Sequence, residues 1–369
     1  MRKRSDQDER QDVHRLPCDT DRSPQLREPR RHRIAEILHI RRGQAQQGVL
    51  AELEEGHEGL FPRVFRRKGI GIRTLRAIDL IADEIVRIDP SVSAEDAKAK
   101  ARAVLEAGGI NIKSKKGKKD EEENPQTGAL MFVSPKQIEA LAKIALSGKA
   151  EKKEVKAALG DNNCADIALF GRMLADDPSL NVDASSQVAH AISTHKVDTE
   201  YDFYTAVDDL QSEDNAGAGM MGTVEFNSST LYRYSTVAVH DLRKNLMDSQ
   251  EATRKAVVEF AKAFVLSMPT GKQNTFANRV VPDFVYICVR NDQPVNFAAA
   301  FEKPVRPSDS EGYVDRSVRR LAEYKSAVCS SFVSEPIKEW QVGMNVEGMG
   351  KHGNLEDILA IISETVSQE

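Results

Sequence analysis

The feature that most constrains the fold is a glycine- and methionine-rich insertion between strand-like runs. This insertion, Gln211–Phe226, precedes the β-branched and aromatic run Leu231–Val239. Strand-like runs joined by a flexible segment predict a long β-hairpin, which we place at residues 208–230. Met220 and Met221 lie near its tip, and exposed apolar side chains there risk aggregation unless they dock on something. We therefore expect the hairpin to contact a neighbouring molecule or to wedge between bases.

Composition bounds the class of protein. The chain has 369 residues, 40% of them hydrophobic, which allows a real core and one to three domains. The net charge of −5 argues against a generally basic nucleic-acid coat, although a local basic face can coexist with it. The four cysteines are scattered without CxxC spacing, so we expect buried free thiols and no metal site. No apolar run could span a bilayer and no signal core is present, which favours a cytoplasmic protein with no membrane partner.

The first 68 residues differ from the rest. They hold 14 Arg and 2 Lys, whereas the remainder holds 14 Arg and 22 Lys. Residues 1–68 show little strand alternation and only patchy helical periodicity, which is typical of a disordered basic arm. A second interpretation is a reading frame that shifts upstream of about Asp12 and is restored near Lys68. Codons for Arg30–Glu55 permit a basic glycine loop and a basic helix in another frame, and the coding DNA would decide between the two.

The sequence pattern of residues 69–160 predicts a helical subdomain. Apolar residues recur at helical spacing over Thr74–Ile88, and Ser93 and Ser134 are good helix starts. Four lysines then follow at spacing i, i+3, i+4, i+7, which predicts a single charged helix face. That face is either simply solvated or a stripe that contacts phosphates. The four are Lys149, Lys152, Lys153 and Lys156.

The next part of the chain, residues 161–305, alternates strands with a helix. Runs of strand character at four places and one amphipathic helix predict an α+β fold with an RRM-like (ferredoxin-like) sheet. Such a sheet exposes a face on which bases can lie. Residues 306–369 show further helices and loops with no chemical motif. The predicted elements are strands at Asp166–Phe170, Val188–Val197, Leu231–Val239 and Val280–Val289, and a helix at Glu251–Met268.

No pattern of catalytic residues is found. His190 and His195 are five apart in a predicted strand, so they point to opposite faces and we expect structural roles for both. Gly271-Lys272 does not open a P-loop, because Gln273 stands where that motif needs Ser or Thr. The loop Thr270–Asn278 is either an ordinary exposed loop or a donor of contacts to a phosphate backbone. We expect no catalytic residue, no cofactor and no bound metal.

Met173 follows Gly171-Arg172, and two interpretations of it stay open. It packs in the core, or it is a second apolar wedge beside the hairpin.

Ordered motifs from about Gly69 to Val305 carry a specific resemblance: DIALFGRM, AHAISTHKVD, FYTAVDDL, EFNSSTLYRY and AFEKPV. With them the chain resembles the CasC family, the backbone subunit of the type I-E CRISPR complex Cascade. The resemblance implies an RRM-like palm, a helical finger subdomain and a β-hairpin thumb. It also implies a non-catalytic protein that lines up in several copies along a CRISPR RNA, beside other Cascade subunits, and presents the guide to target DNA.

The resemblance assigns roles to single residues. Arg172 and Met173 match the place where the RNA is kinked, and Thr223 and Phe226 match the part of the thumb near the RNA. The lysine stripe matches a helix that lies along target DNA. A guide-contacting loop is matched by Lys272, Gln273 and Asn274.

One departure from the family is large. The first strand and basic helix of the family do not appear in residues 1–68, so we expect weak or no assembly if the chain is made as written. Two other functions are kept as alternatives: an endonuclease that processes CRISPR RNA, and a stand-alone RNA-recognition module. The first needs a histidine cluster and the second an aromatic RNP signature, neither of which is evident.

Overall fold

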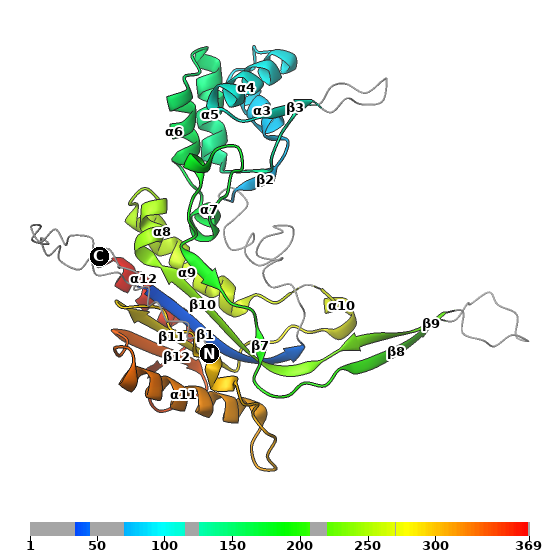
Figure 1. The fold of residues 1–369 in the computed structure, drawn as a ribbon, viewed down its shortest axis with the longest axis vertical. Helices are drawn as coiled ribbons and strands as arrows, with labels where there is room; N and C mark the ends of the chain where they lie inside the picture. Colours follow the sequence, from blue (N-terminus) through cyan, green and yellow to red (C-terminus); the bar gives the residue numbers. More distant parts are fainter. Residues whose placement is uncertain (1–33, 45–69, 115–124, 207–219, 270, 368–369) are drawn as a thin grey trace, which may run out of the picture. The chain divides into compact units, whose positions relative to one another are not determined.

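The computed structural model describes residues 34–44 as backbone only, and residues 70–114, 125–206, 220–269 and 271–367 in full apart from the side chain of Ser114. These residues belong to one structural unit, residues 32–369. They comprise a helical subdomain, a large mixed sheet with helices, and a separate hairpin (Figure 1).

The helical subdomain is held by its own apolar core. Its helices begin where the sequence predicts: the Ser93 side chain accepts a hydrogen bond from Asp96 N, and Ser134 and Gln137 form a reciprocal capping box. Isoleucines, leucines and alanines from all four helices fill the core. The helices are α3 (Ala77–Ile88), α4 (Ala94–Gly108), α5 (Pro135–Ser147) and α6 (Lys152–Gly160). Two short ladders join them: β2 (Ile72–Thr74) with β5 (Met131–Val133), and β3 (Ile112–Ser114) with β4 (Pro125–Thr127).

The large sheet has seven strands within the described residues. Its order is β13-β12-β11-β1-β10-β6, and β7 also pairs with β10. All pairs are antiparallel except β12 with β13. The strands are β1 (Ile34–Gln44), β6 (Ser186–Val188), β7 (Ile192–Ser193), β10 (Ser228–Ala238), β11 (Phe284–Arg290), β12 (Lys338–Gly343) and β13 (Lys351–His352).

Strand β1 corrects the expectation that residues 1–68 supply no sheet strand. It lies between β10 and β11, so that Ile34 is opposite both Ala238 and Arg290. A central strand satisfies its backbone groups on both sides by pairing, and strand propensity depends strongly on such context. The other parts of the anomalous segment, residues 1–33 and 45–68, lie outside the described residues.

The topology agrees with the predicted ferredoxin-like order in one half. Strands β10 and β11 flank β1 and are connected by α9 (Gln250–Leu266), which is a split βαβ unit. In the other half, β11 and β12 are direct neighbours although α11 (Tyr313–Ser331) connects them. The fold is therefore a mixed α+β fold.

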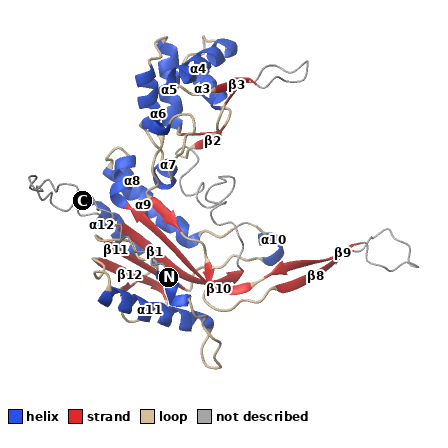
Figure 2. Cartoon of the chain, in the orientation of Figure 1, coloured by secondary structure: helices blue, strands red, loops and turns tan. Residues whose placement is uncertain are grey.

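Helices cover both faces of this sheet, as Figure 2 shows for α9 and α11. On one face, α8 (Val239–Asn245), α9 and α12 (Leu355–Ser367) pack on Val285 and Ile287. On the other, α11 and the 3₁₀ helix η2 (Phe297–Phe301) pack on Tyr232 and Tyr286. The expectation of a sheet face open to bases is wrong for these strands, because their aromatic side chains are buried under protein.

Two predicted strands differ in the structure. Residues Ala165–Phe170 form a short helix, α7, which ends at Gly171. The run Val188–Val197 is broken into β6 and β7, and His190 lies between them, so it does not share a strand with His195. A run of six residues such as ADIALF, five of them apolar, fits either period, and length alone cannot separate a short helix from a short strand.

The hairpin forms a sheet of its own. Strand β8 (Glu200–Ala206) pairs with β9 (Met220–Phe226) in the register Ala206↔Met220 to Glu200↔Phe226. A hairpin is present, but its first arm lies before the expected range of residues 208–230 and its second arm lies within it. Residues 207–219 lie outside the described residues.

Candidate nucleic-acid interface

Arg172 is the anchor of the segment that carries Met173. Its side chain is buried, and Nη2 donates to the carbonyls of Leu159 at 2.8 Å and Leu180 at 2.8 Å. Nη1 donates to the side chain of Gln137 at 3.3 Å and to the carbonyl of Phe132 at 3.4 Å. The predicted RNA contact of Arg172 is therefore corrected: its guanidinium ties four parts of the helical subdomain together and faces away from solvent.

Met173 points the opposite way. In extended backbone successive side chains alternate, so a buried Arg172 turns Met173 outward. Its side chain is 83% exposed, which excludes core packing and leaves the wedge interpretation. Gly171 allows the backbone before Arg172 to lie close to the backbone of Val182. Its φ is +79°, and a Cβ there would lie 2.7 Å from the carbonyl oxygen of Val182.

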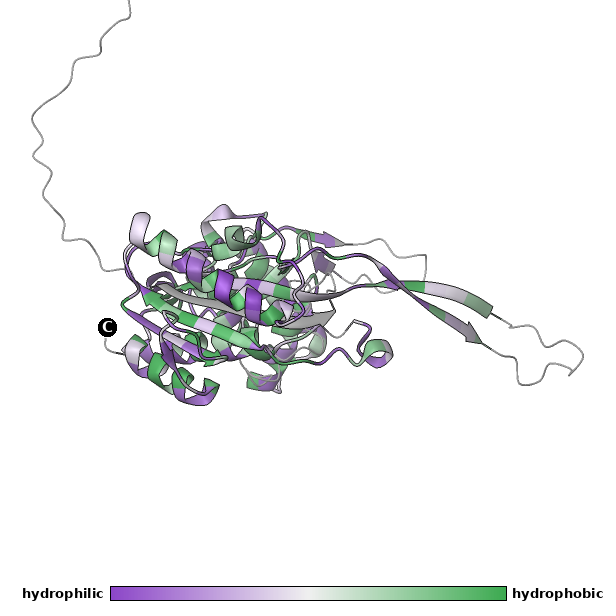
Figure 3. Ribbon diagram, turned by 90° about the horizontal axis from the view of Figure 1, so that it is seen from below, coloured by the Kyte–Doolittle hydropathy of each residue, from purple (hydrophilic) through white to green (hydrophobic). Residues whose placement is uncertain are grey.

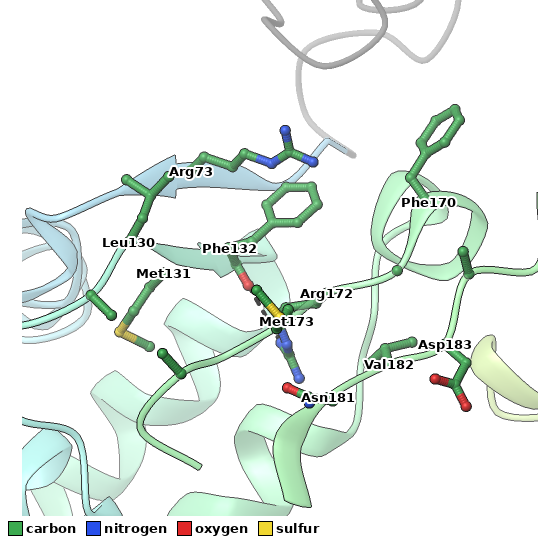
Figure 4. Close-up of a pocket in the computed structure, with 14 residues that line it drawn as sticks. Arg73, Leu130, Met131, Phe132, Phe170, Arg172, Met173, Asn181, Val182 and Asp183 are labelled. Carbon is green, nitrogen blue, oxygen red and sulfur yellow. Dashed lines mark hydrogen bonds between the residues drawn. The ribbon is translucent and has the colours of Figure 1, made fainter. Parts of the chain in front are cut away.

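A cleft of about 690 Å³ opens beside Met173. Its walls carry Leu130, which is 56% exposed, and Phe132, which is half-buried. The guanidinium of Arg73 lies 4.6 Å above the centre of the Phe132 ring, as Figure 4 shows. An exposed cation on an aromatic face, next to exposed apolar side chains, is a surface on which a planar base can stack.

The hairpin presents apolar side chains on both of its faces. The cross-strand register places Met221, Phe203 and Tyr201 on one face, and Met220 on the other. Met220 and Met221 are both exposed, and Figure 3 shows the start of β9 as hydrophobic. Thr223 is exposed on the face of Met221. The two methionines therefore lie on opposite faces of the hairpin.

The aromatic residues of β8 are functional candidates that the sequence reasoning missed. Every residue of β8 is exposed, including Tyr201, Phe203 and Tyr204. Tyr204 lies across Gly222, where a Cβ would be 2.5 Å from the tyrosine oxygen. Three aromatics within four residues of an exposed strand were the available signal, because a solvated strand has no need of them.

The loop predicted to contact phosphates lies against the root of the hairpin. The Phe226 ring, which is half-buried, packs on the Phe276 ring with centroids 5.5 Å apart. Lys272 is exposed at φ +58° and begins the short helix α10 (Gln273–Phe276). Asn274 is exposed as well, whereas Gln273 is half-buried and accepts a hydrogen bond from Arg279 Nη2. Lys272 and Asn274 are therefore the accessible donors of this loop.

The lysine stripe is shorter than predicted. Helix α6 begins at Lys152, so Lys149 precedes it and does not lie on the predicted helical face. Lys156 is half-buried, is ion-paired with Asp177, and donates to Ser179 Oγ at 3.3 Å. Lys149, Lys152 and Lys153 stay exposed.

Comparison with known proteins adds an independent finding. The model of the CT1975-like protein family matches residues 57–367, which is more than half of the chain. The chain belongs to the CT1975-like family. A solved chain described as "CRISPR RNA-guided surveillance complex, pre-nicking" is similar with a TM-score of 0.75 and 29% identity, over 91% of this chain and 99% of that one. A second, described as "CRISPR RNA-guided surveillance complex", has a TM-score of 0.65 and 24% identity over 91% and 100%, and shows the fold alone. No curated protein matches the sequence.

His195 of this CT1975-like chain has structural contacts. His195 Nε2 accepts the Thr230 N–H at 3.0 Å, so Nδ1 carries the proton and donates to the Lys196 carbonyl at 2.7 Å. Its ring also stacks on Tyr313 with centroids 3.9 Å apart. Both ring nitrogens are occupied, and His190 lies exposed in the loop before β7.

Three cysteines lie within the described residues of this family member. Cys164, Cys288 and Cys329 form no disulfide, and burial raises the pKa of Cys164. Within the described ranges no set of three or more His, Cys, Asp or Glu side chains is grouped to hold a metal ion. In the same residues no helix is long and apolar enough to cross a membrane.

Proposed function

We propose that this chain is a non-catalytic backbone subunit of a type I-E CRISPR RNA-guided surveillance complex. Several copies line up along one CRISPR RNA beside other subunits and present its bases to target DNA. Sequence is then read by base pairing, and the protein reads the shape and phosphates of the RNA. We expect this to take place in the cytoplasm, where both nucleic acids are found.

The observation that carries the proposal is the similarity to a subunit described as part of such a complex. It extends over 91% of this chain and 99% of the other, at a TM-score of 0.75 and 29% identity. The motifs that suggest the CasC family, such as FYTAVDDL and EFNSSTLYRY, fall on the hairpin and the strand that follows it.

The exposed apolar side chains supply the physical support. Met173 stands beside a cleft whose wall carries the Arg73–Phe132 pair. An unbranched apolar side chain inserted between two bases unstacks and kinks a strand, and the displaced base can then stack on Phe132. Leu130 and Phe132 thus extend the site beyond the residues that the sequence indicated.

The hairpin supplies the contact to the next copy. A two-stranded hairpin alone is marginally stable in water, and here all of β8 is exposed. Docking of Met221 and Phe203 on a neighbour would bury that apolar area. Met220, on the opposite face, would then lie over the RNA held by the neighbour.

The exposed cations are assigned to phosphates. Lys272 and Asn274 are proposed to contact the guide, and Lys149, Lys152 and Lys153 the target DNA. Lys156 is left out because Asp177 neutralises it.

Absence of catalysis is part of the proposal, and the alternative is an endonuclease that processes the CRISPR RNA. Such an enzyme needs a general base within reach of a ribose hydroxyl. His195 is a poor candidate, because both its nitrogens are bonded to backbone groups.

The test is to purify the chain expressed with a CRISPR array and its processing nuclease, and to compare it with a Met173→Ala variant. Because Met173 is 83% exposed, we expect the variant to fold with unchanged melting temperature. Wild type is expected to retain RNA of uniform length, and the variant to retain several-fold less. Phe332→Ala, at a residue 84% exposed on the end of α11, is the matched control and should retain RNA like wild type.

Two outcomes would contradict the proposed function. One is a well-folded wild-type chain that carries no RNA. The other is cleavage of precursor RNA by the purified chain alone, which would favour the endonuclease.

A further inference from the structure

A second cleft, lined by arginines, lies away from every residue assigned above. It measures about 640 Å³ and is bounded by the segment Lys303–Arg306 and by α11. This cleft, here called the arginine groove, is on the α11 face of the sheet, whereas α9 packs on the other face. The groove is lined by Lys303, Pro304, Val305, Arg306, Arg316, Arg319, Arg320 and Glu323.

The walls of the groove are fixed by guanidinium groups. Arg316 Nη1 donates to the carbonyls of residues 306 and 307, and Arg320 Nη1 donates to the carbonyl of residue 303. The segment 303–307 therefore runs along α11 in the opposite direction. Arg316 and Arg320 are four residues apart, which is about one helical turn, so they form one row of the groove.

The charge of the groove is one-sided. Five cationic side chains line it and Glu323 is the single lining carboxylate. Glu311 forms a bidentate ion pair with Arg319, and no carboxylate within the described residues pairs with Arg306, Arg316 or Arg320. Like charges held this close repel one another, so a bound anion would stabilise them.

The chemistry of the groove favours a strand of nucleic acid over an acidic protein. Protein interfaces are anchored by buried apolar or aromatic side chains, and here Pro304 is the single exposed apolar residue of the lining. Arginines in a row along an open track match a polymer with one negative charge on each unit. Half-buried guanidiniums held by carbonyls keep further N–H groups for phosphate oxygens.

We propose that the arginine groove binds the phosphodiester backbone of a nucleic-acid strand other than the guide. The proposal rests on the proposed function only in assigning the guide to the Met173 cleft and the Lys272 loop. Contact to phosphates gives affinity without base readout, so the strand is held whatever its sequence.

The experiment uses charge reversal at the two lining cations whose side chains have no described hydrogen bond or ion pair. Lys303→Glu with Arg306→Glu changes the groove and leaves the Arg316 and Arg320 contacts to backbone carbonyls in place. Lys244→Glu with Lys255→Glu is the matched control. It makes the same change in net charge at exposed residues of α8 and α9, on the other face of the sheet.

The readout is the affinity of each protein for a fluorescein-labelled single-stranded DNA that cannot pair with the retained RNA, measured over a range of NaCl concentrations. Loss of two phosphate contacts should reduce the slope of log K against log salt by about 1.4, at about 0.7 per contact. The control should keep the wild-type slope.

Equal slopes for the groove variant and the control overturn the proposal. So does a groove variant that binds DNA like wild type but changes in particle mass, which would assign the groove to a protein partner. The absorbance at 260 nm of RNA that copurifies with wild type tests the proposed function independently of the arginine groove. Wild type without RNA contradicts the proposed function, while the DNA slopes still decide the groove.

Discussion

Arg172 and Met173 are adjacent residues, but one is buried and the other is exposed. The Arg172 guanidinium donates hydrogen bonds to carbonyls that are 8 to 40 residues away in sequence, whereas the Met173 side chain lies in solvent. Because the buried residue cannot move without breaking several hydrogen bonds, the backbone that carries Met173 is fixed. A fixed backbone lowers the entropy that is lost when a wedge inserts, although the methionine side chain itself still has rotamers to lose.

Arg172→Ala tests this anchoring. The carbonyls of Leu159 and Leu180 and the amide oxygen of Gln137 would each lose a hydrogen bond inside the protein, and Leu180 would keep no other described donor. We therefore expect the free energy of unfolding to fall by about 3 kcal/mol. Urea denaturation would measure it, and Arg172→Lys should fall between the two. A change within about 0.5 kcal/mol, as for ordinary surface residues, would contradict the anchoring role.

Asp177 makes a pH-dependent contribution at the same scale. Lys156, with the hydroxyl and N–H of Ser179, lowers the pKa of Asp177 to about 2 from 3.8. The folded state therefore binds this proton less readily than the unfolded state. Its contribution is complete above about pH 4 and is lost as the pH falls to about 2.

Asp177→Asn should accordingly flatten the acid side of the stability curve. Between about pH 4 and pH 2, the free energy of unfolding should fall less steeply in the variant than in wild type. Asp161→Asn, at an exposed aspartate whose side chain has no described partner, is the control. Parallel curves for wild type and Asp177→Asn would show that the pair does not form in solution.

At the scale of elements, the hairpin β8–β9 is the part most dependent on other molecules. It shares no ladder with the large sheet, and its root touches the body through Phe226 and Phe276. Its two methionines face opposite sides, so one can meet a neighbouring subunit while the other meets RNA.

Met220→Ser with Met221→Ser should leave the monomer folded and weaken assembly. Both side chains are exposed, so we expect a change in stability within about 0.5 kcal/mol. Light scattering should report a shift from multi-subunit particles to single subunits. Phe332→Ser, at another exposed apolar residue, should not shift the mass. Identical particle masses for the double variant and the control would remove the hairpin from the assembly contact.

Elements with long periodic patterns and strong caps were predictable from sequence. The helix starts at Ser93 and Ser134, the strand β10 and the helix α9 all lie within a few residues of the expected places, whereas the first arm of the hairpin lies before its expected range. Short elements were not. ADIALF fits both periods, and its helix ends at Gly171 through a left-handed φ that pattern reading does not reveal.

Sequence reasoning selected several residues that are exposed in the structure, and it failed where contacts between distant segments decide the position of a side chain. Met173, Met220 and Met221 are as accessible as the wedge interpretation requires. Arg172 is buried because it bonds to the carbonyl of Leu180, and Lys156 is neutralised by the carboxylate of Asp177. Both partners come close only in the folded chain. No local pattern could have assigned either residue to an internal contact.

For the whole molecule, strand β1 is the element on which the sheet depends. It connects β10 to β11, and the family model matches from residue 57 onward, so β1 lies outside that match. The shifted-frame hypothesis therefore stays a prediction. The structure adds one requirement to it, which is that the protein made from either frame must supply a strand between β10 and β11. Mass spectrometry of tryptic peptides from the native protein should detect peptides of the alternative frame between about residues 12 and 68. Peptides of the printed sequence there would contradict the hypothesis.

The projecting hairpin also has a consequence for how an assembly could end. A contact in which one copy reaches forward and the next receives is head-to-tail, and such contacts do not close on themselves unless the rotation returns to its start. Growth would then have no internal stop. A length standard outside the protein, or a differently shaped cap on the last copy, would have to terminate the filament and cover its final Met221 and Phe203.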